Sequence, residues 1–226
     1  MDVQVKVHRV TNQLRLNLGC GQTAPHGWEN IDRSPNVLLD RIPFAKQLLR
    51  RIGILREEHM TSWPRNIKRL DLTKRLPYPD GSVAAVYSSH TLEHFYHNEA
   101  TDLLFECRRV LQPGGVLRLA LPNAQEIARQ LLEAGPETAA AAGLTFTVRL
   151  HMAPLTKPTR KQQLVGKFAS APHRWQPTPA LIVDMLSKAG FSDVTQFGYL
   201  VGSLPDLKDV EHRPESLFVE GYVLES

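Results

Sequence analysis

The stretch LNLGCGQTAPHGWENID, residues 16–32, decides which fold the chain can adopt. It opens with alternating apolar and polar residues, as a strand does, and then turns through Gly19-Cys20-Gly21. A second short apolar patch follows and ends at Asp32. A glycine turn with an acidic residue after the next strand is typical of a nucleotide-type cofactor site. Ten residues separate Gly21 from Asp32, which leaves little room for the usual crossover helix, so an ordinary turn between strands is the alternative.

Strand and helix patterns alternate along the remaining chain. Strands are predicted at residues 14–18, 29–31, 67–72, 83–88, 116–121, 191–199 and 216–224. Helices are predicted at residues 42–56, from an Asn98 cap to the Pro113-Gly114-Gly115 stop, from an Asn123 cap to Gly135, and from a Thr178 cap to Gly190. This alternation predicts an α/β fold with a mostly parallel sheet covered on both faces.

Two segments fall outside the alternation, and we expect both to be insertions at the rim of a single domain. Residues 40–66 are basic and partly helical, and residues 136–177 combine an alanine run with scattered prolines. The second segment is expected to be a mobile cover over the pocket at this rim, because its prolines and glycines break regular structure; a rigid elaboration that widens the core is the alternative. Its solvated cations are Lys157, Arg160 and Lys161, and its candidate docking residues are Phe168 and Trp175.

The composition indicates a globular protein in a reducing compartment. Of the 226 residues, 42% are hydrophobic and 22% charged, and no run approaches the roughly 18 consecutive apolar residues of a membrane span. The two cysteines, Cys20 and Cys107, form neither a metal-ligand nor a disulfide pattern, and the amino terminus lacks a signal-peptide pattern. We expect a cytoplasmic protein with no membrane span; the oligomeric state stays open.

The charge balance permits an anionic partner without requiring one. The net charge is +4 at pH 7, and ten lysines and arginines lie between Arg41 and Arg75. A basic patch can attract phosphates or a membrane surface. A solvated face is the simpler interpretation, because Trp63 is the main aromatic residue among these cations, and we expect no nucleic-acid partner.

Five segments, taken together, resemble a known family. LNLGCG, NID, RLDLTKRLPYPDGSVAAVYSSHTLEH, ECRRVLQPGGVLRLALPN and MLSKAGF occur in the order seen in class I S-adenosylmethionine-dependent methyltransferases. The resemblance is strongest to the small bacterial branch called type 11, and it covers about residues 14–122 and 178 to the end. It implies a Rossmann-like fold, with a seven-stranded, mostly parallel sheet whose last strand is antiparallel and helices on both faces. One methyltransferase domain would then span residues 1–226.

The resemblance also implies a cofactor, S-adenosylmethionine, and a role for each matching position. Leu18, Gly19, Cys20 and Gly21 would lie against its methionine portion, Asp32 would hold the ribose diol, Asp71 and Leu72 would border the adenine, and Ser88, Ser89 and His90 would form the floor beside the sulfonium. Between the glycine turn and Asp32, the chain departs from the commonest pattern of this family, because most of its members have a helix in that segment. We therefore predict a cofactor site whose first crossover is reduced to a loop. A nicotinamide site is disfavoured, because G-x-G-x-x-G is absent.

Histidines supply the candidate bases. His90 is the first candidate to accept a proton from the methyl acceptor and His94 the second, because histidine titrates near neutral pH and this segment should border the methyl group. His90 and His94 would share one face of a helix, as metal ligands require. Glu93 would then point elsewhere, and no third ligand is evident, so no metal is expected. Cys20 is explained better as a small turn residue than as a nucleophile.

The acceptor is the least constrained part of the prediction. His173 and Trp175 could offer a base and a stacking surface to a substrate, or they could anchor the insertion. The leading function is methylation of a small-molecule or sugar-containing acceptor. RNA methylation is the second possibility, because the basic region permits it. A non-catalytic S-adenosylmethionine-binding module is the third, because the motif Asn-Pro-Pro-Tyr is absent.

Overall fold

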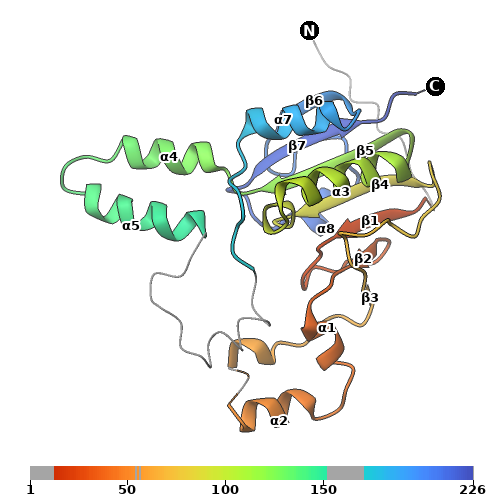
Figure 1. Ribbon diagram of the computed structural model, residues 1–226, viewed down its shortest axis with the longest axis horizontal. Helices are drawn as coiled ribbons and strands as arrows, with labels where there is room; N and C mark the ends of the chain where they lie inside the picture. The colour runs from red at the N-terminus through yellow and green to blue at the C-terminus, as the bar shows by residue number, and fades with distance from the viewer. Residues whose placement is uncertain (1–12, 54, 56, 152–170, 226) are drawn as a thin grey trace.

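The computed structural model describes residues 13–53, 55, 57–151 and 171–225, and its centre is one seven-stranded sheet (Figure 1). The strands lie in the order β3-β2-β1-β4-β5-β7-β6, and β7 alone runs antiparallel to its two neighbours. Their bounds are β1 Arg15–Leu18, β2 Glu29–Ile31, β3 Ile67–Lys68, β4 Val83–Ser89, β5 Leu111–Leu121, β6 Ser192–Phe197 and β7 Leu217–Tyr222. The predicted sheet, with its antiparallel last strand, is confirmed.

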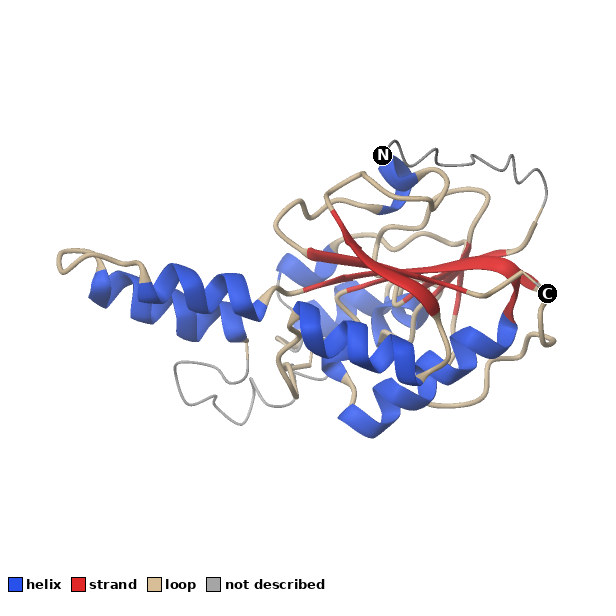
Figure 2. Cartoon of the chain, turned by 90° about the horizontal axis from the view of Figure 1, so that it is seen from above, coloured by secondary structure: helices blue, strands red, loops and turns tan. Residues whose placement is uncertain are grey.

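Helices cover the two faces of the sheet unevenly (Figure 2). The apolar sides of α3 (His97–Val110) and α7 (Pro179–Lys188) pack into the main core, with Leu103, Leu104 and Ile182 buried. The opposite face is covered by the short α8 (Leu207–Val210) and by loops. The remaining helices are α1 Pro35–Leu39, α2 Ala45–Arg51, α4 Ala124–Leu132, α5 Ala139–Leu150 and the 3-10 turns η1 Glu57–Met60 and η2 Leu92–His94.

Helix caps predicted from the sequence are mostly present. The Asn123 side chain accepts a hydrogen bond from the Glu126 N–H (3.1 Å), and the Thr178 hydroxyl accepts from the Leu181 N–H (3.3 Å). These bonds satisfy amide groups that the first turn of a helix leaves free. The predicted Asn98 cap is wrong, because α3 already begins at His97.

Other element bounds also shift. The helix predicted at 42–56 is shorter, as α2 covers Ala45–Arg51, and the strand predicted at 67–72 keeps two residues. The Pro113-Gly114-Gly115 stop lies inside β5 rather than before it, because the strand starts directly after α3. Glycine is required at position 115, where a Cβ would lie 2.8 Å from the Gln112 carbonyl oxygen.

The first crossover, residues 19–28, contains no helix, as predicted from its length. Two buried asparagines in the neighbouring strands hold this loop instead. The Asn17 amide donates to the Thr23 carbonyl (2.8 Å) and to the Asn30 side chain (3.0 Å), and the Asn30 amide donates to the Pro25 carbonyl (3.0 Å). Because buried amides are costly unless bonded, these contacts fix both the loop and the asparagines.

The two segments proposed as insertions lie outside the sheet. In residues 40–66, the buried Lys46 ammonium lies 2.7 Å from the Asp40 carboxylate and donates to the Thr61 carbonyl (2.6 Å). Part of the basic excess is therefore neutralised within the segment. In residues 136–177, α5 packs against α4, and the pair projects from the body as a helical hairpin (Figures 1 and 2).

The middle of the proposed cover, residues 152–170, lies outside the described part of the chain. Lys157, Arg160, Lys161 and Phe168 fall in residues 152–170, outside the described residues. Among the residues that are described, no helix is long and apolar enough to cross a membrane.

Candidate active site

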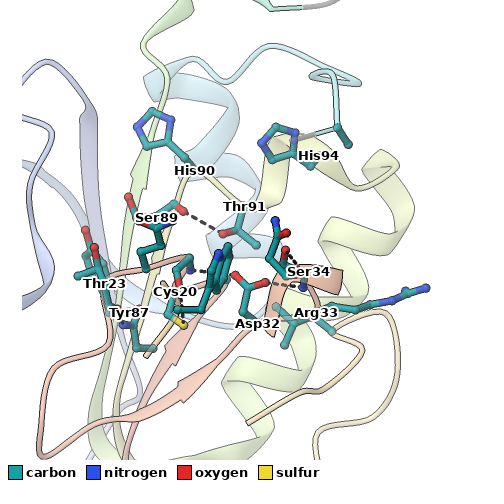
Figure 3. A pocket seen from close by; sticks show the side chains of 18 of the residues that line it. Cys20, Thr23, Asp32, Arg33, Ser34, Tyr87, Ser89, His90, Thr91 and His94 are labelled. Carbon is teal, nitrogen blue, oxygen red and sulfur yellow. Dashed lines mark hydrogen bonds between the residues drawn. The ribbon is translucent and has the colours of Figure 1, made fainter. Parts of the chain in front are cut away.

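A cavity of about 690 Å³ lies at the carboxyl ends of β1, β2 and β4 (Figure 3). Open α/β sheets bind ligands at this edge, because the strand order reverses there between β1 and β4. Eight of the predicted cofactor residues line the cavity: Gly19, Cys20, Gly21, Asp32, Asp71, Leu72, Ser89 and His90.

Leu18 and Ser88 do not line the cavity. Both are buried in the sheet, where the Ser88 hydroxyl donates to the Leu18 carbonyl (3.1 Å) across β4 and β1. The structure thus places these two residues beneath the site, holding together the ends of its two central strands.

Asp32 connects the ends of the first two strands. One carboxylate oxygen accepts from the Gly21 N–H (2.8 Å) and the other from the Ser34 N–H (2.6 Å). Each oxygen keeps a second lone pair for a ligand. The residue that the sequence pattern assigns to the ribose diol therefore also fixes the glycine turn.

Asp71 also lines the cavity and is held by two partners. Its carboxylate accepts from the Thr73 hydroxyl (2.8 Å), and Arg33 forms an ion pair with it at 2.8 Å. Burial alone would raise the pKa of the Asp71 carboxyl, but the Thr73 and Arg33 contacts outweigh burial and hold this pKa below its usual value. Asp71 is therefore an anion at neutral pH.

The glycine turn has a steric and an electrostatic feature. Gly19 adopts φ +66°, and a Cβ there would lie 2.0 Å from the Thr91 hydroxyl oxygen, so no other residue fits. Burial, followed by the charge of Asp32, raises the pKa of the Cys20 thiol to about 12. A neutral thiol is a poor nucleophile, which agrees with a structural role for Cys20.

His90 stands at the boundary between this cavity and a second one of about 330 Å³. Its φ of 48° is uncommon for a residue with a Cβ, and such strain is often found at functional sites. Its Nε2 lies 2.9 Å from the Ser216 hydroxyl, and its Nδ1 lies 3.4 Å from the Glu93 carboxylate. His94, the second candidate base, also borders both cavities.

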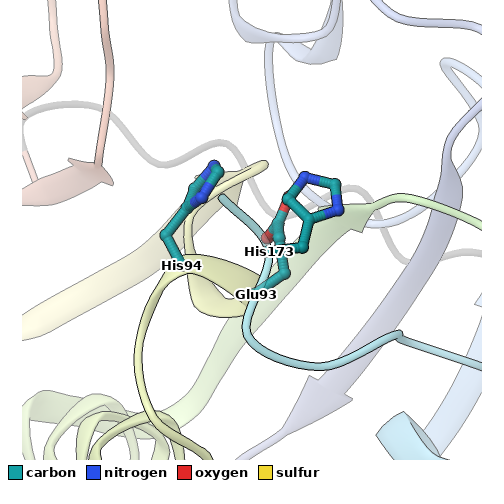
Figure 4. A group of neighbouring side chains, drawn as sticks. All are labelled: Glu93, His94 and His173. Atoms are coloured by element: carbon teal, nitrogen blue, oxygen red, sulfur yellow. The ribbon is translucent and has the colours of Figure 1, made fainter. Parts of the chain in front are cut away.

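The expected arrangement around Glu93 is wrong. We expected a helix that turns Glu93 away from His90 and His94, but Leu92–His94 forms a 3-10 turn with Glu93 fully buried. The Glu93 carboxylate faces His90 and, 3.8 Å away, Nε2 of His173 (Figure 4). Sequence spacing could not reveal this contact, because His173 comes 80 residues later.

The two predicted substrate residues have different surroundings. His173 lines the second cavity, and burial lowers the pKa of its imidazole, so it is neutral at pH 7. Trp175 lines neither cavity: its indole N–H donates to the Phe95 carbonyl (3.2 Å), and its ring packs against the main core and His97. The structure therefore places Trp175 as a support for the segment that carries His173.

Several lining residues were not singled out from the sequence. Thr91 lies under Gly19, Tyr87 comes from the middle of β4, and Arg213 borders both cavities. Arg213 follows Glu211, which ion-pairs with the buried Arg118. The sequence offers no local signal for this ion pair, because the two residues are 93 positions apart.

Comparisons with known proteins agree with this fold. A family model described as a methyltransferase domain matches residues 16–119. A solved S-adenosylmethionine-dependent methyltransferase from Methanosarcina mazei is 15% identical, with 100% of each chain covered and a TM-score of 0.50. SibL, an S-adenosylmethionine-dependent methyltransferase solved in its apo form, is 16% identical with a TM-score of 0.50, covering 99% of this chain.

Two of the similar solved structures are longer than this chain. The chain spans 53% of SibL. It also spans 56% of PigF, solved with SAH, which is 16% identical over 94% of this chain with a TM-score of 0.45. No curated protein matches the sequence.

Proposed function

We propose that the chain, whose residues 16–119 match a family model described as a methyltransferase domain, is a class I S-adenosylmethionine-dependent methyltransferase that methylates a small polar acceptor bound in the second cavity. The observation that carries this proposal is the arrangement of the two cavities. They share His90, His94 and Arg213 as lining residues, so ligands in the two would meet at these side chains.

The larger cavity fits the cofactor. Gly21 exposes its backbone to open space, and the carboxylates of Asp32 and Asp71 can accept hydrogen bonds from hydroxyl and amino groups. Such acceptors suit the ribose diol and the adenine amine of S-adenosylmethionine. When bound, the cofactor supplies an electrophilic methyl group on its sulfonium.

The second cavity suits a small, polar acceptor. Its volume of about 330 Å³ lies at the lower end of the roughly 300–1,000 Å³ of ligand pockets, which favours a small molecule over a folded RNA. Arg149 and Arg213 supply positive charge to its lining, while Glu215 and Asn123 add hydrogen-bond acceptors. A hydroxyl-bearing or anionic acceptor, including a sugar-containing one, matches this lining.

His90 is suited to accept the acceptor's proton. With Glu93 next to Nδ1, the favoured tautomer carries its proton on that nitrogen and leaves Nε2 basic. Nε2 lies 2.9 Å from the hydroxyl of Ser216, a residue that lines the second cavity. Alignment of acceptor and methyl group supplies much of the rate, because positioning alone can provide effective molarities of roughly 10⁵ to 10⁸ M.

The test is turnover with labelled cofactor. The chain is incubated with methyl-labelled S-adenosylmethionine and either a deproteinised metabolite extract or purified total RNA. We expect label in a small molecule of the extract, insensitive to nuclease, together with S-adenosylhomocysteine. Label in nuclease-sensitive material would favour RNA methylation, and cofactor binding without any transfer would favour the non-catalytic module.

Arg149 gives a sharper prediction about the acceptor. It lines the second cavity but not the first, and its guanidinium donates to Gln130 at 2.7 Å. Arg149→Gln should raise KM for the acceptor roughly tenfold or more, as expected for a lost hydrogen bond to a charged group. The affinity for S-adenosylhomocysteine, measured by calorimetry, should stay unchanged.

The matched control is Arg129→Gln on the partner helix α4. Arg129 is exposed, pairs with Glu126 and Glu133, and lines neither cavity. Its replacement should leave KM unaltered. Equal effects of the two substitutions on KM would show that the acceptor does not bind beside Arg149 in the second cavity.

A further inference from the structure

We propose that Glu93, His94 and His173 bind a divalent transition-metal ion, with Zn²⁺ as the ion that fits these ligands best (Figure 4). Nothing in the proposed methyl transfer requires such a site. It is indicated by a buried carboxylate and two imidazoles that come together from separate parts of the chain.

The Glu93 carboxylate is the first observation. Its side chain has no exposed surface, and no described residue donates a hydrogen bond to either of its oxygens. Imidazole nitrogens of His90 and His173 lie 3.4 and 3.8 Å from one of these oxygens. As an anion, a buried carboxylate without hydrogen bonds is strongly destabilising unless a cation neutralises it.

The two imidazoles are the second observation. His94 and His173 lie with ring centroids 5.1 Å apart, and the ligand atoms of all three residues lie within 4.8 Å of one another. In a tetrahedral zinc site, ligand atoms are roughly 3.3–3.5 Å apart. Side-chain rotations that move the ligand atoms by about 1–1.5 Å would therefore complete the site. Two histidines and one glutamate are a known zinc ligand set.

Backbone contacts hold the three ligands in place. The Arg174 N–H donates to the Glu93 carbonyl (2.8 Å), and the Arg174 guanidinium donates to the His94 carbonyl (3.1 Å). The His173 N–H donates to the His151 carbonyl (2.9 Å). The segments are therefore joined without a metal, which lowers the entropic cost of assembling the site.

His90 and His151 form the surroundings of the site. His90 can donate from Nδ1 to the Glu93 carboxylate, as outer-shell groups often do to a metal-bound carboxylate, and the His151 ring lies 5.2 Å from that of His173. His94 and His173 also line the second cavity. Three protein ligands occupy three of the four positions of a tetrahedral zinc ion, so the fourth stays open to a ligand in the second cavity.

The site suggests a class of acceptor, an inference that rests on the proposed function. An acceptor with a hydroxyl or carboxylate oxygen could occupy the open position, because Zn²⁺ accepts oxygen as well as nitrogen ligands. The metal site itself does not depend on this step and can be tested without any acceptor.

Metal binding is tested on the full chain after treatment with a chelator and dialysis. Calorimetric titration with ZnCl₂ should show one ion per chain, and CoCl₂ should produce the visible absorption of tetrahedral cobalt. Glu93→Gln and His173→Ala should each weaken zinc binding by more than the roughly 10- to 100-fold that an outer-shell contact contributes. His26→Ala, an exposed histidine outside both cavities, should bind as the parent does.

Circular dichroism controls for folding, and His94→Ala, which alters the least buried of the three ligands, serves if Glu93→Gln does not fold. Absence of one-to-one zinc binding by the parent, or equal binding by the parent and the two folded variants, would overturn the proposal. If the chain binds zinc but still transfers methyl groups after chelator treatment, the metal site is supported, but the acceptor does not bind to the metal. If no methyl transfer is detected, the zinc titration alone still decides whether the metal site exists.

Discussion

Arg118→Ala is expected to lower the free energy of unfolding by about 3–5 kcal/mol, the range found when one partner of a buried ion pair is removed. Arg118 on β5 has no exposed side-chain surface, and it pairs with the equally buried Glu211 and Glu220. It also donates to the carbonyls of Val201 (2.8 Å) and Gly198 (3.0 Å). Alanine would leave two carboxylates and two carbonyls without these bonds. Urea unfolding followed by circular dichroism measures the loss.

Arg129→Ala is the control for this substitution. Arg129 also pairs with two carboxylates, those of Glu126 and Glu133, but its side chain is 53% exposed. Exposed pairs contribute about 0–1 kcal/mol, because water screens them and their side chains lose entropy on pairing. Similar losses in the two variants would show that burial of the Arg118 cluster is not what makes it stabilising.

The Arg118 cluster also connects stability to the site. Glu211 lies one residue before His212 and two before Arg213, which line the main cavity. In addition, Glu220 accepts from the Ser203 N–H (2.9 Å), so the cluster holds the loop that leads into α8. The fraction of the Arg118→Ala variant that still folds should therefore also bind S-adenosylhomocysteine more weakly than the parent.

Local signals in the sequence predicted the features that depend on neighbouring residues. Asn123 and Thr178 are recognisable as caps because their partners lie three positions later. The short first crossover follows from the distance between Gly21 and Asp32. The acid after β2 is recognisable because parallel strands bring their carboxyl ends to one edge.

Features that depend on distant residues were not predictable in this way. Arg118 has the pattern of an ordinary polar residue in a strand, and its partner Glu220 is 102 positions away. Glu93 was misplaced because the segment forms a 3-10 turn, which changes the direction of each side chain relative to an α-helix. Helix α5 was not predicted, because its larger apolar residues Leu144, Phe146, Val148 and Leu150 alternate along the sequence instead of recurring at helical spacing.

Asp32→Ala is expected to weaken binding of S-adenosylhomocysteine by about 10- to 100-fold, corresponding to the roughly 1.5–3 kcal/mol of a hydrogen bond to a charged group. The carboxylate would be lost as an acceptor for the ribose hydroxyls. The Gly21 and Ser34 amides would lose their partner as well, at 2.8 and 2.6 Å, so the glycine turn would be less well ordered. Calorimetry with the purified chain measures the affinity.

Two further variants separate the contributions of Asp32. Asp32→Asn keeps one carbonyl oxygen for a backbone amide but removes the charge, so its affinity should fall between those of parent and alanine variant. Asp184→Ala removes an exposed carboxylate that pairs with Lys188 on α7, away from the cavity, and should bind as the parent does. If Asp32→Ala binds as tightly as Asp184→Ala, the ribose does not contact Asp32. The order parent, asparagine, alanine is the result expected when the charge and the hydrogen bonds of this carboxylate both hold the cofactor.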